Sequence, residues 1–247
     1  MLWCDGGSAL RGAALSRIGY VSESQEMPDG MTVQAYLDFV RPFYPAWDGA
    51  LERQLLAEFG LPLDRKLKHL SRGMRMKVAF VSVLSYRPEL LVLDEPFSGL
   101  DPLVREELIQ GLLDRIGETT LFLSSHDLSE IEGFASHVGY LEQGSMLFSE
   151  ELTALSGRFR QLQFRTALAG LPEGLPASWL EVEQSGPFVK ATESAFSDAS
   201  QTQAVVERLF PGASDLTIAP LGLRSIFLAT AKSQREQREK AQTGAGL

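Results

Sequence analysis

The chain has 247 residues, of which 44% are hydrophobic and 22% are charged, and these proportions exclude disordered, collagen-like and fibrous proteins. The 32 Asp and Glu residues outnumber the 23 Lys and Arg residues, which gives a formal charge of -9. An acidic chain lacks the positive charge that sequence-independent binding to phosphate backbones requires, so we expect no nucleic-acid partner.

The cysteine content and the hydropathy pattern indicate the compartment. The single cysteine, Cys4, cannot form an internal disulfide, which fits a reducing environment. No apolar run approaches the roughly 20 residues that span a bilayer, and the N-terminal residues lack the pattern of a secretory signal. We therefore expect a cytoplasmic protein, which can still dock on a membrane protein.

The first part of the chain predicts one short strand followed by helices. Residues 17–21 read as the strand. Thr32 and Asp48 are typical N-caps, each followed by apolar residues at helical spacing. A third helix is predicted over residues 74–86, and Pro88 ends it.

From residue 90 onward, the pattern alternates between strand and helix. The run Leu90-Leu91-Val92-Leu93 is continuously apolar, as expected of a strand buried on both faces in a parallel sheet. The alternation predicts an α/β core with crossover helices. The elements after the first strand are a helix about residues 103–116, a strand at 119–123, a helix about 128–135 and a hairpin over 138–148.

The pattern of predicted strands and helices changes along the chain and divides it into domains. Residues 1–154 are expected to form the α/β domain, with a helical subdomain over about residues 30–87. Short strands punctuated by Gly and Pro predict a small α+β domain over residues 155–231. The segment 232–247 is rich in Gln, Lys and Glu without an apolar face, so we expect a disordered tail.

Two adjacent carboxylates follow the first buried strand, at the edge where open α/β sheets bind ligands. Asp94 can hold Mg²⁺ through water, because that ion dehydrates reluctantly. Glu95 can orient or deprotonate an attacking water. The alternative interpretation is a solvated acidic pair at a strand end.

Further residues of chemical interest lie before and after this pair. His126 closes the next predicted strand, so its imidazole is expected at the same sheet edge as Glu95. Ser71 precedes the helix at residue 74, and helix N-termini attract phosphate. The alternatives are a structural histidine and a simple N-cap.

The order and spacing of these residues resemble the ATP-binding cassette (ABC) family of transport ATPases over about residues 17–150. Leu70-Ser71-Arg72-Gly73-Met74 resembles the family signature L-S-G-G-Q, with Arg72 and Met74 at its third and fifth positions. Leu90 to Pro96 resembles the Walker B strand with its catalytic Glu, and Ser98-Gly99-Leu100-Asp101 resembles the D-loop. His126 takes the place of the switch histidine, and the run Phe43 to Asp48 is similar to bacterial exporter ATPases that pair with separate permeases.

The resemblance implies a P-loop NTPase-like ABC ATPase core that binds ATP and Mg²⁺. It implies that Glu95 and His126 are catalytic and that Asp94 binds Mg²⁺ through water. The signature residues would contact the nucleotide of a second subunit, since family members work as head-to-tail dimers. These residues are Ser71, Arg72, Gly73 and Met74, and the D-loop residues are Ser98, Gly99 and Asp101.

The sequence departs from the family pattern in two places. At the Q-loop, Glu23 stands where the family has Gln, and Gln25 follows two residues later, so either side chain is a candidate for reaching Mg²⁺ or the attacking water. The phosphate loop G-x-x-x-x-G-K-[ST], or Walker A motif, is missing, because none of the 22 glycines precedes a lysine. We expect that the chain begins inside the ATPase domain.

The expected function is that of an ABC-type ATPase subunit, peripheral on the cytoplasmic face of the membrane, that energises a separate membrane permease. Residues 32–59 correspond to the segment through which the family meets the permease. The P-loop would come from a second ABC ATPase subunit, in a heterodimer, or from an upstream segment. The alternative is a degenerate, non-hydrolytic interaction or regulatory subunit of the same type of transporter.

Overall fold

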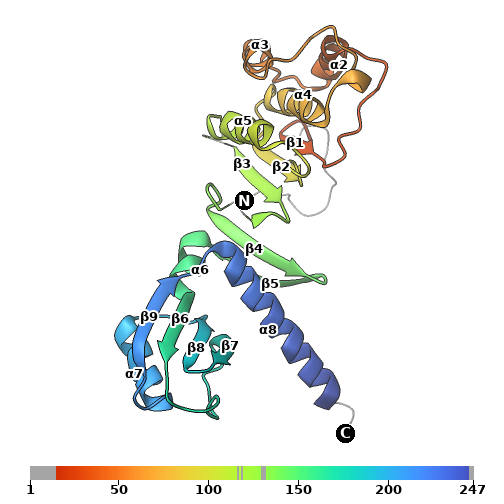
Figure 1. The fold of residues 1–247 in the computed structure, drawn as a ribbon. Coiled ribbons are helices and arrows are strands. Elements are labelled where there is room, and N and C mark those ends of the chain that lie inside the picture. Colours follow the sequence, from red (N-terminus) through yellow and green to blue (C-terminus); the bar gives the residue numbers. More distant parts are fainter. Residues whose placement is uncertain (1–14, 116, 118, 129–131, 245–247) are drawn as a thin grey trace. The chain divides into compact units, whose positions relative to one another are not determined.

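The computed structural model describes residues 15–115, 117, 119–128 and 132–244 (Figure 1). The expectation for Cys4 lies outside these residues, as does the middle of the helix predicted at 128–135; residues 132–134 form a turn. The chain divides into two compact units, Met1–His126 and Asp127–Leu247. Within the described ranges, no helix has both the length and the apolar character needed to cross a membrane.

The first unit is built on a parallel three-stranded sheet (Figure 1). Its strands are β1 (Ile18–Val21), β2 (Leu90–Asp94) and β3 (Thr120–Ser124), in the order β1-β2-β3. The register pairs Val21 with Leu93, and Asp94 with Ser124. The predicted α/β core is therefore confirmed, and the last residues of β2 and β3 meet at one edge.

The helices of this unit begin where polar side chains can cap them. The oxygens of Thr32, Asp48, Ser71 and Asp101 each accept a hydrogen bond from a backbone N–H in the first turn of the following helix. These four helices are α2 (Val33–Val40), α3 (Gly49–Glu58), α4 (Arg72–Leu84) and α5 (Pro102–Leu113), and two short 3₁₀ helices, η1 (Arg41–Phe43) and η2 (Leu67–His69), lie between them.

Helix α4 packs on one face of the sheet at van der Waals distance. Val21, Leu91 and Leu93 have no exposed surface. A Cβ atom at Gly19 would lie 2.8 Å from Cδ1 of Leu91 and 3.4 Å from Cβ of Val83, so only glycine permits this approach of strand and helix.

The opposite face of the sheet carries an exposed apolar row. The register places Tyr20, Val92 and Phe122 side by side on the three strands. Tyr20 is 55% exposed and Phe122 is 64% exposed. The run from Leu90 to Leu93 is therefore not buried on both faces of the sheet, and that prediction is wrong. Leu91 and Leu93 lie on the buried face that packs against α4, whereas Leu90 and Val92 lie on the other face and are only partly buried.

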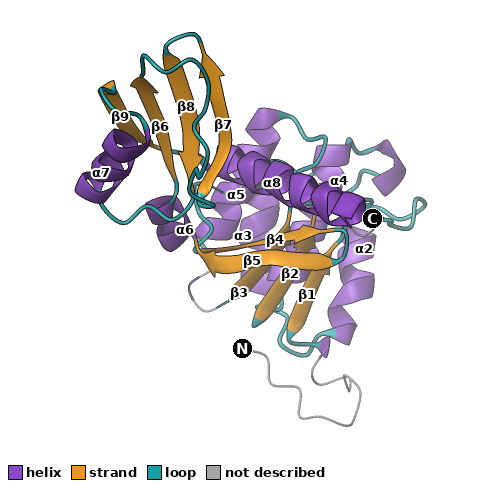
Figure 2. Cartoon of the chain, turned by 90° about the horizontal axis from the view of Figure 1, so that it is seen from below, coloured by secondary structure: helices purple, strands orange, loops and turns teal. Residues whose placement is uncertain are grey.

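The second unit contains a hairpin and a four-stranded antiparallel sheet (Figure 2). The sheet is covered on one face by α7, and Phe164, Trp179, Val206 and Phe210 belong to its core. The hairpin strands are β4 (His137–Glu142) and β5 (Ser145–Glu151), and the helix is α7 (Ala199–Leu209). The sheet consists of β6 (Arg160–Arg165), β7 (Trp179–Ser185), β8 (Phe188–Glu193) and β9 (Ser214–Pro220). Its strand order is β7-β8-β6-β9.

A second apolar cluster joins the hairpin to two helices, α6 (Leu152–Arg158) and α8 (Leu223–Gly244). Val138, Leu155 and Ile226 are among its buried members. The hairpin therefore belongs to the second unit, whereas the predicted domain boundary at residue 154 would place it in the first. Helix α8 continues through residues 232–244, where the sequence predicts a disordered tail. Ion pairs from Lys232 to Glu181 (2.6 Å) and from Arg235 to Glu142 (3.3 Å) extend its attachment beyond the apolar cluster.

Candidate nucleotide-hydrolysis site

The carboxyl edge of the parallel sheet brings Asp94 and Glu95 together with the end of β3. The Oγ of Ser124 donates a hydrogen bond of 2.6 Å to Oδ1 of Asp94. The backbone N–H of Glu95 donates to the carbonyl oxygen and to Oγ of Ser124, at 3.2 and 3.1 Å. Ser124 therefore fixes the positions of both acidic residues.

Glu95 and His126 contact each other directly. Oε2 of Glu95 lies 2.7 Å from Nδ1 of His126. Glu95 has a φ of 48°, in the left-handed region where a residue with a side chain is strained by about 1–3 kcal/mol. This conformation turns the partly buried carboxylate of Glu95 toward the exposed imidazole, so the predicted convergence of the two side chains is present in the structure.

The donor set at this edge fits one kind of magnesium site. The described residues contain no cluster of three or more His, Cys, Asp or Glu side chains that could hold a metal ion. Mg²⁺ at phosphate-transfer sites needs only one or two carboxylates, because waters and phosphate oxygens complete its shell. Asp94, exposed at the end of β2, fits that type of site.

The signature residues form the N-terminal end of α4. Oγ of Ser71 accepts a hydrogen bond from the backbone N–H of Met74 at 3.2 Å, so the Ser71 hydroxyl caps the helix. Arg72 is the first helical residue. A Cβ atom at Gly73 would lie 2.9 Å from Cγ1 of Val104, so glycine is required here for α4 to approach α5.

The D-loop residues divide between a turn and a helix cap. Gly99 has a φ of 66°, which favours glycine. Oδ1 of Asp101 accepts a hydrogen bond from the backbone N–H of Leu103 at 2.9 Å, so this carboxylate caps α5. Ser98 donates from Oγ to Oε1 of Glu23 at 3.1 Å and thereby ties the D-loop to the Q-loop.

The two Q-loop candidates have different surroundings. Oε1 of Glu23 also accepts a hydrogen bond of 3.4 Å from Nη2 of Arg72. Gln25 bonds back to Ser22, once through its side chain and once through its backbone N–H, both at 3.2 Å. Of the two, only Glu23 bonds to both the signature and the D-loop.

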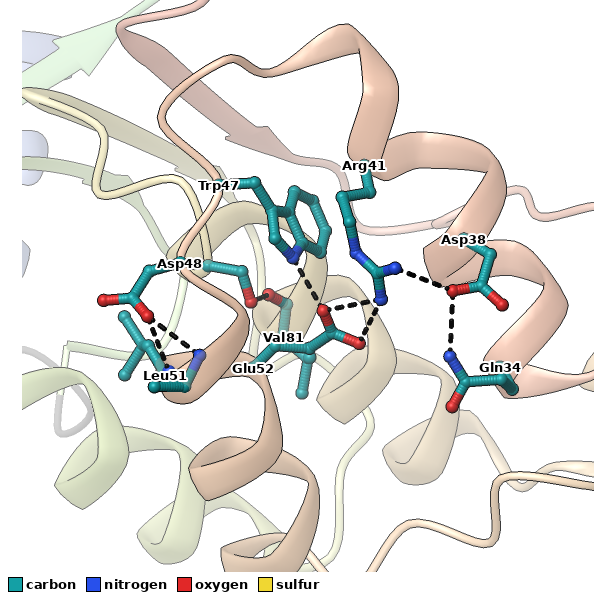
Figure 3. Close-up of polar contacts among 10 residues, drawn as sticks. Gln34, Asp38, Arg41, Trp47, Asp48, Leu51, Glu52 and Val81 are labelled. Atoms are coloured by element: carbon teal, nitrogen blue, oxygen red, sulfur yellow. Dashed lines mark hydrogen bonds and ion pairs between the residues drawn. The ribbon is translucent and has the colours of Figure 1, made fainter.

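A buried carboxylate organises the exporter-like run in the helical region (Figure 3). Glu52, which is only 3% exposed, accepts two hydrogen bonds from Nη2 of Arg41, at 3.0 and 2.9 Å. Nε1 of Trp47 donates to the same carboxylate at 2.6 Å. Nearby, the backbone N–H of Asp48 bonds to the carbonyl of Ser85 at 2.6 Å.

Sequence reasoning alone missed Ser124 and Glu52. Ser124 lies in a Ser-Ser-His-Asp segment, and its role follows only from the register that pairs it with Asp94. Glu52 lies one turn after the cap of α3, where an acidic residue is ordinary. Its burial depends on Arg41 and Trp47, which belong to other segments.

Comparisons with known proteins agree with this arrangement. Residues 35–132 match the family model described as "AAA domain, putative AbiEii toxin, Type IV TA system". The chain is 28% identical over 146 residues to the ABC transporter ATP-binding protein YtrB of Bacillus subtilis, covering 58% of this chain and 50% of that protein. It is 37% identical over 151 residues to the bacitracin transport ATP-binding protein BcrA of Enterococcus faecalis, covering 59% and 49%.

A solved structure titled "Structure of ATP binding subunit of ABC transporter" is 25% identical and superposes with a TM-score of 0.54, over 59% of this chain and 63% of that one. The first unit is thus an α/β core similar to that of ABC ATPases. Sequence and fold together relate the chain to the ATP-binding subunits of ABC transporters, and the chain spans about half the length of the curated relatives YtrB and BcrA.

Proposed function

We propose that this chain is an ATP-binding and ATP-hydrolysing subunit of an ABC transporter, which acts on the cytoplasmic face of a membrane and energises a separate permease. The observation that carries the proposal is the meeting of Asp94, Glu95 and His126 at the carboxyl edge of one parallel sheet. Carboxylates and imidazole at this position are suited to activating water against a phosphate.

Each residue has a role that its contacts support. The carboxylate of Glu95 accepts a proton from the attacking water or orients that water, and His126 holds this carboxylate through its 2.7 Å contact. Ser124 keeps Asp94 beside Glu95. Mg²⁺, held by Asp94 through water, would neutralise phosphate charge.

The site requires a P-loop, because its Lys and backbone amides bind the β- and γ-phosphates in this class of ATPase. We propose that a second, P-loop-containing ATPase subunit or a further segment of the protein supplies it. The exposed row Tyr20, Val92 and Phe122 supports this proposal, since parallel sheets of α/β proteins are covered on both faces. In a head-to-tail dimer, the end of α4 at Ser71 to Met74 would face the nucleotide of the partner subunit.

The helical region supports a membrane partner. Phe39 and Phe43 are both exposed, and their rings meet edge to face with centroids 5.6 Å apart. Exposed aromatic pairs are typical anchors of protein interfaces. We propose that this end of α2 and η1 belongs to the surface that docks on the permease.

The experiment is an ATPase assay of the chain assembled with its permease and a P-loop-containing subunit. Glu95→Gln removes the carboxylate but keeps its shape. Where this chain carries a P-loop segment of its own, turnover should fall by roughly 10²–10⁴-fold while ATP binding persists. Where the P-loop lies only on the second subunit, Glu95 has no nucleotide of its own and the rate should hardly change. Glu106→Gln, on the exposed surface of α5, is the matched control and should leave the rate unchanged.

The outcome also tests the alternative of a non-hydrolytic subunit. If this chain carries its own P-loop segment and the complex still hydrolyses ATP at the wild-type rate despite Glu95→Gln, a catalytic role for Glu95 is refuted. Transport that still depends on the chain's presence would then indicate an interaction or regulatory role.

A further inference from the structure

Two of the positions at which the sequence departs from the ABC motifs contact each other. Glu23 replaces the Q-loop Gln, Arg72 replaces the third signature residue, and their side chains form an ion pair. We propose that Glu23 is a positioning residue that restrains Arg72 at rest, and that this restraint opens when a phosphate of the partner's nucleotide reaches Arg72. The inference rests on the proposed function. It gives Glu23, one of the two Q-loop candidates, a role of its own.

The carboxylate of Glu23 bridges three segments through one oxygen. Nη2 of Arg72 donates to Oε1 at 3.4 Å, and Oγ of Ser98 donates to the same atom at 3.1 Å. The Q-loop, the start of α4 and the D-loop are therefore linked at this carboxylate. A group held in this way orients its neighbours, and its engaged oxygen is not available to Mg²⁺ unless both bonds break.

The guanidinium of Arg72 packs against the backbone of Gly99. A Cβ atom at Gly99 would lie 3.5 Å from both Cζ and Nη1 of Arg72, so the arginine packs directly over the glycine backbone. The φ of 66° at Gly99 also favours the absence of a side chain. The resting position of Arg72 thus depends on Gly99 below it and on Glu23 beside it.

The restraint is weak enough for a phosphate to displace. The side chains of Arg72 and Glu23 are 49% and 52% exposed, and exposed ion pairs contribute little free energy. Among the residues that the structure describes, Arg72 donates only to Glu23, while a guanidinium carries five N–H groups. A phosphate can accept two of these at once through two of its oxygens, whereas Glu23 accepts a single N–H of Arg72, through Oε1.

Arg72 also lies where an anion is favoured. It is the first residue of α4, and the positive end of a helix dipole adds to the attraction for phosphate. Removing the carboxylate of Glu23 should therefore make Arg72 easier to recruit. Removing Arg72 should abolish any effect of Glu23.

The first test measures KM and kcat for MgATP in the assembled complex with its P-loop-containing subunit. Glu23→Ala should lower KM about 2- to 5-fold with kcat nearly unchanged, which corresponds to the loss of an exposed ion pair. Arg72→Ala should raise KM, Arg72→Lys should recover part of it, and Glu23→Ala should have no effect in the Arg72→Ala background. Glu26→Ala, a neighbouring exposed acid, is the matched control.

Two results would overturn the proposal. A fall in kcat of tenfold or more in Glu23→Ala would place Glu23 on the attacking water or on Mg²⁺ instead. An effect of Glu23→Ala that persists without Arg72 would show that the two residues act independently.

The second test needs no ATPase activity and uses the full chain alone, with inorganic phosphate as the probe. The side-chain ¹⁵N resonance of Arg72 should move on Glu23→Ala but not on Glu26→Ala, and phosphate should move it at lower concentration in Glu23→Ala than in the wild type. A resonance that ignores Glu23→Ala or phosphate refutes the restraint. If the resonance behaves as expected while the wild-type complex never hydrolyses ATP, the proposed function fails and the restraint stands.

Discussion

Nδ1 of His126 lies 2.7 Å from Oε2 of Glu95, although 31 positions separate the two residues in the chain. The distance follows from the topology, because β2 and β3 are parallel neighbours and both residues follow their carboxyl ends. The left-handed conformation of Glu95 completes the approach. We therefore expect the imidazole and the carboxylate to act as one unit in any chemistry at this edge.

That unit predicts non-additive effects. In an assembled ATPase in which this chain carries a P-loop segment of its own, Glu95→Gln and His126→Ala should each reduce turnover, and the double variant should be little worse than Glu95→Gln alone. The reason is that each substitution removes the same contact, and residues that act together do not contribute independently. Steady-state ATPase rates of the four proteins measure the coupling, and additive losses would show that His126 acts without Glu95.

Gly73 should be intolerant of any side chain, for a packing reason. Gly73→Ala should destabilise the first unit by about 1–3 kcal/mol, despite the better helix propensity of alanine, because its Cβ would lie 2.9 Å from Cγ1 of Val104. Adding Val104→Ala should recover part of the loss. Gly30→Ala is the control, since no atom lies within 4 Å of its Cβ position, and equal effects of the two glycine substitutions in urea unfolding would contradict the packing argument.

Glu52 should be important for the stability of the helical region. Glu52→Gln replaces one accepting oxygen by an NH₂ group that faces the donors of Arg41 and Trp47, so we expect a loss of about 1–3 kcal/mol. Trp47 fluorescence reports the transition when Trp3 and Trp179, the other two of the three tryptophans, are replaced by Phe. The exposed Glu106→Gln should leave the midpoint unchanged, and a similarly neutral Glu52→Gln would show that the buried contacts contribute nothing.

The acid sensitivity of the same region should depend in part on Asp48. Hydrogen bonds from Arg87 and then from the backbone of Leu51 hold the pKa of Asp48 below its ordinary value. Because the folded pKa is the lower one, the stabilisation is present above the unfolded pKa of about 3.9 and is lost as the pH falls through the folded value.

Asp48→Asn keeps an N-capping side chain but removes the charge. Its midpoint in urea should therefore lie below that of the wild type at pH 7, and the difference should shrink as the pH falls below about 4. Arg87→Gln should show the same pH dependence. A difference that stays constant between pH 7 and pH 3 would show that the cap, and not the charge, carries the effect.

Most local elements of this protein could be predicted from the sequence. Thr32 and Asp48 cap helices as predicted, and Ser71 also caps a helix, which was the alternative interpretation for that residue. An N-cap needs only its own side chain and the next few backbone N–H groups. The strands β1, β2 and β3 were expected within one or two residues of their bounds. The convergence of Glu95 and His126 also followed, since parallel strands end at a common edge.

Contacts between distant segments were decided only by the tertiary structure. Neither the pairing of Glu23 with Arg72 nor the double role of Ser124 is encoded in a local pattern. The ion pairs that α8 makes past residue 231 are likewise with Glu181 and Glu142, which lie far earlier in the chain. Capping and strand formation are short-range effects that a sequence window contains, whereas the partner of a charged side chain is set by how the elements pack together.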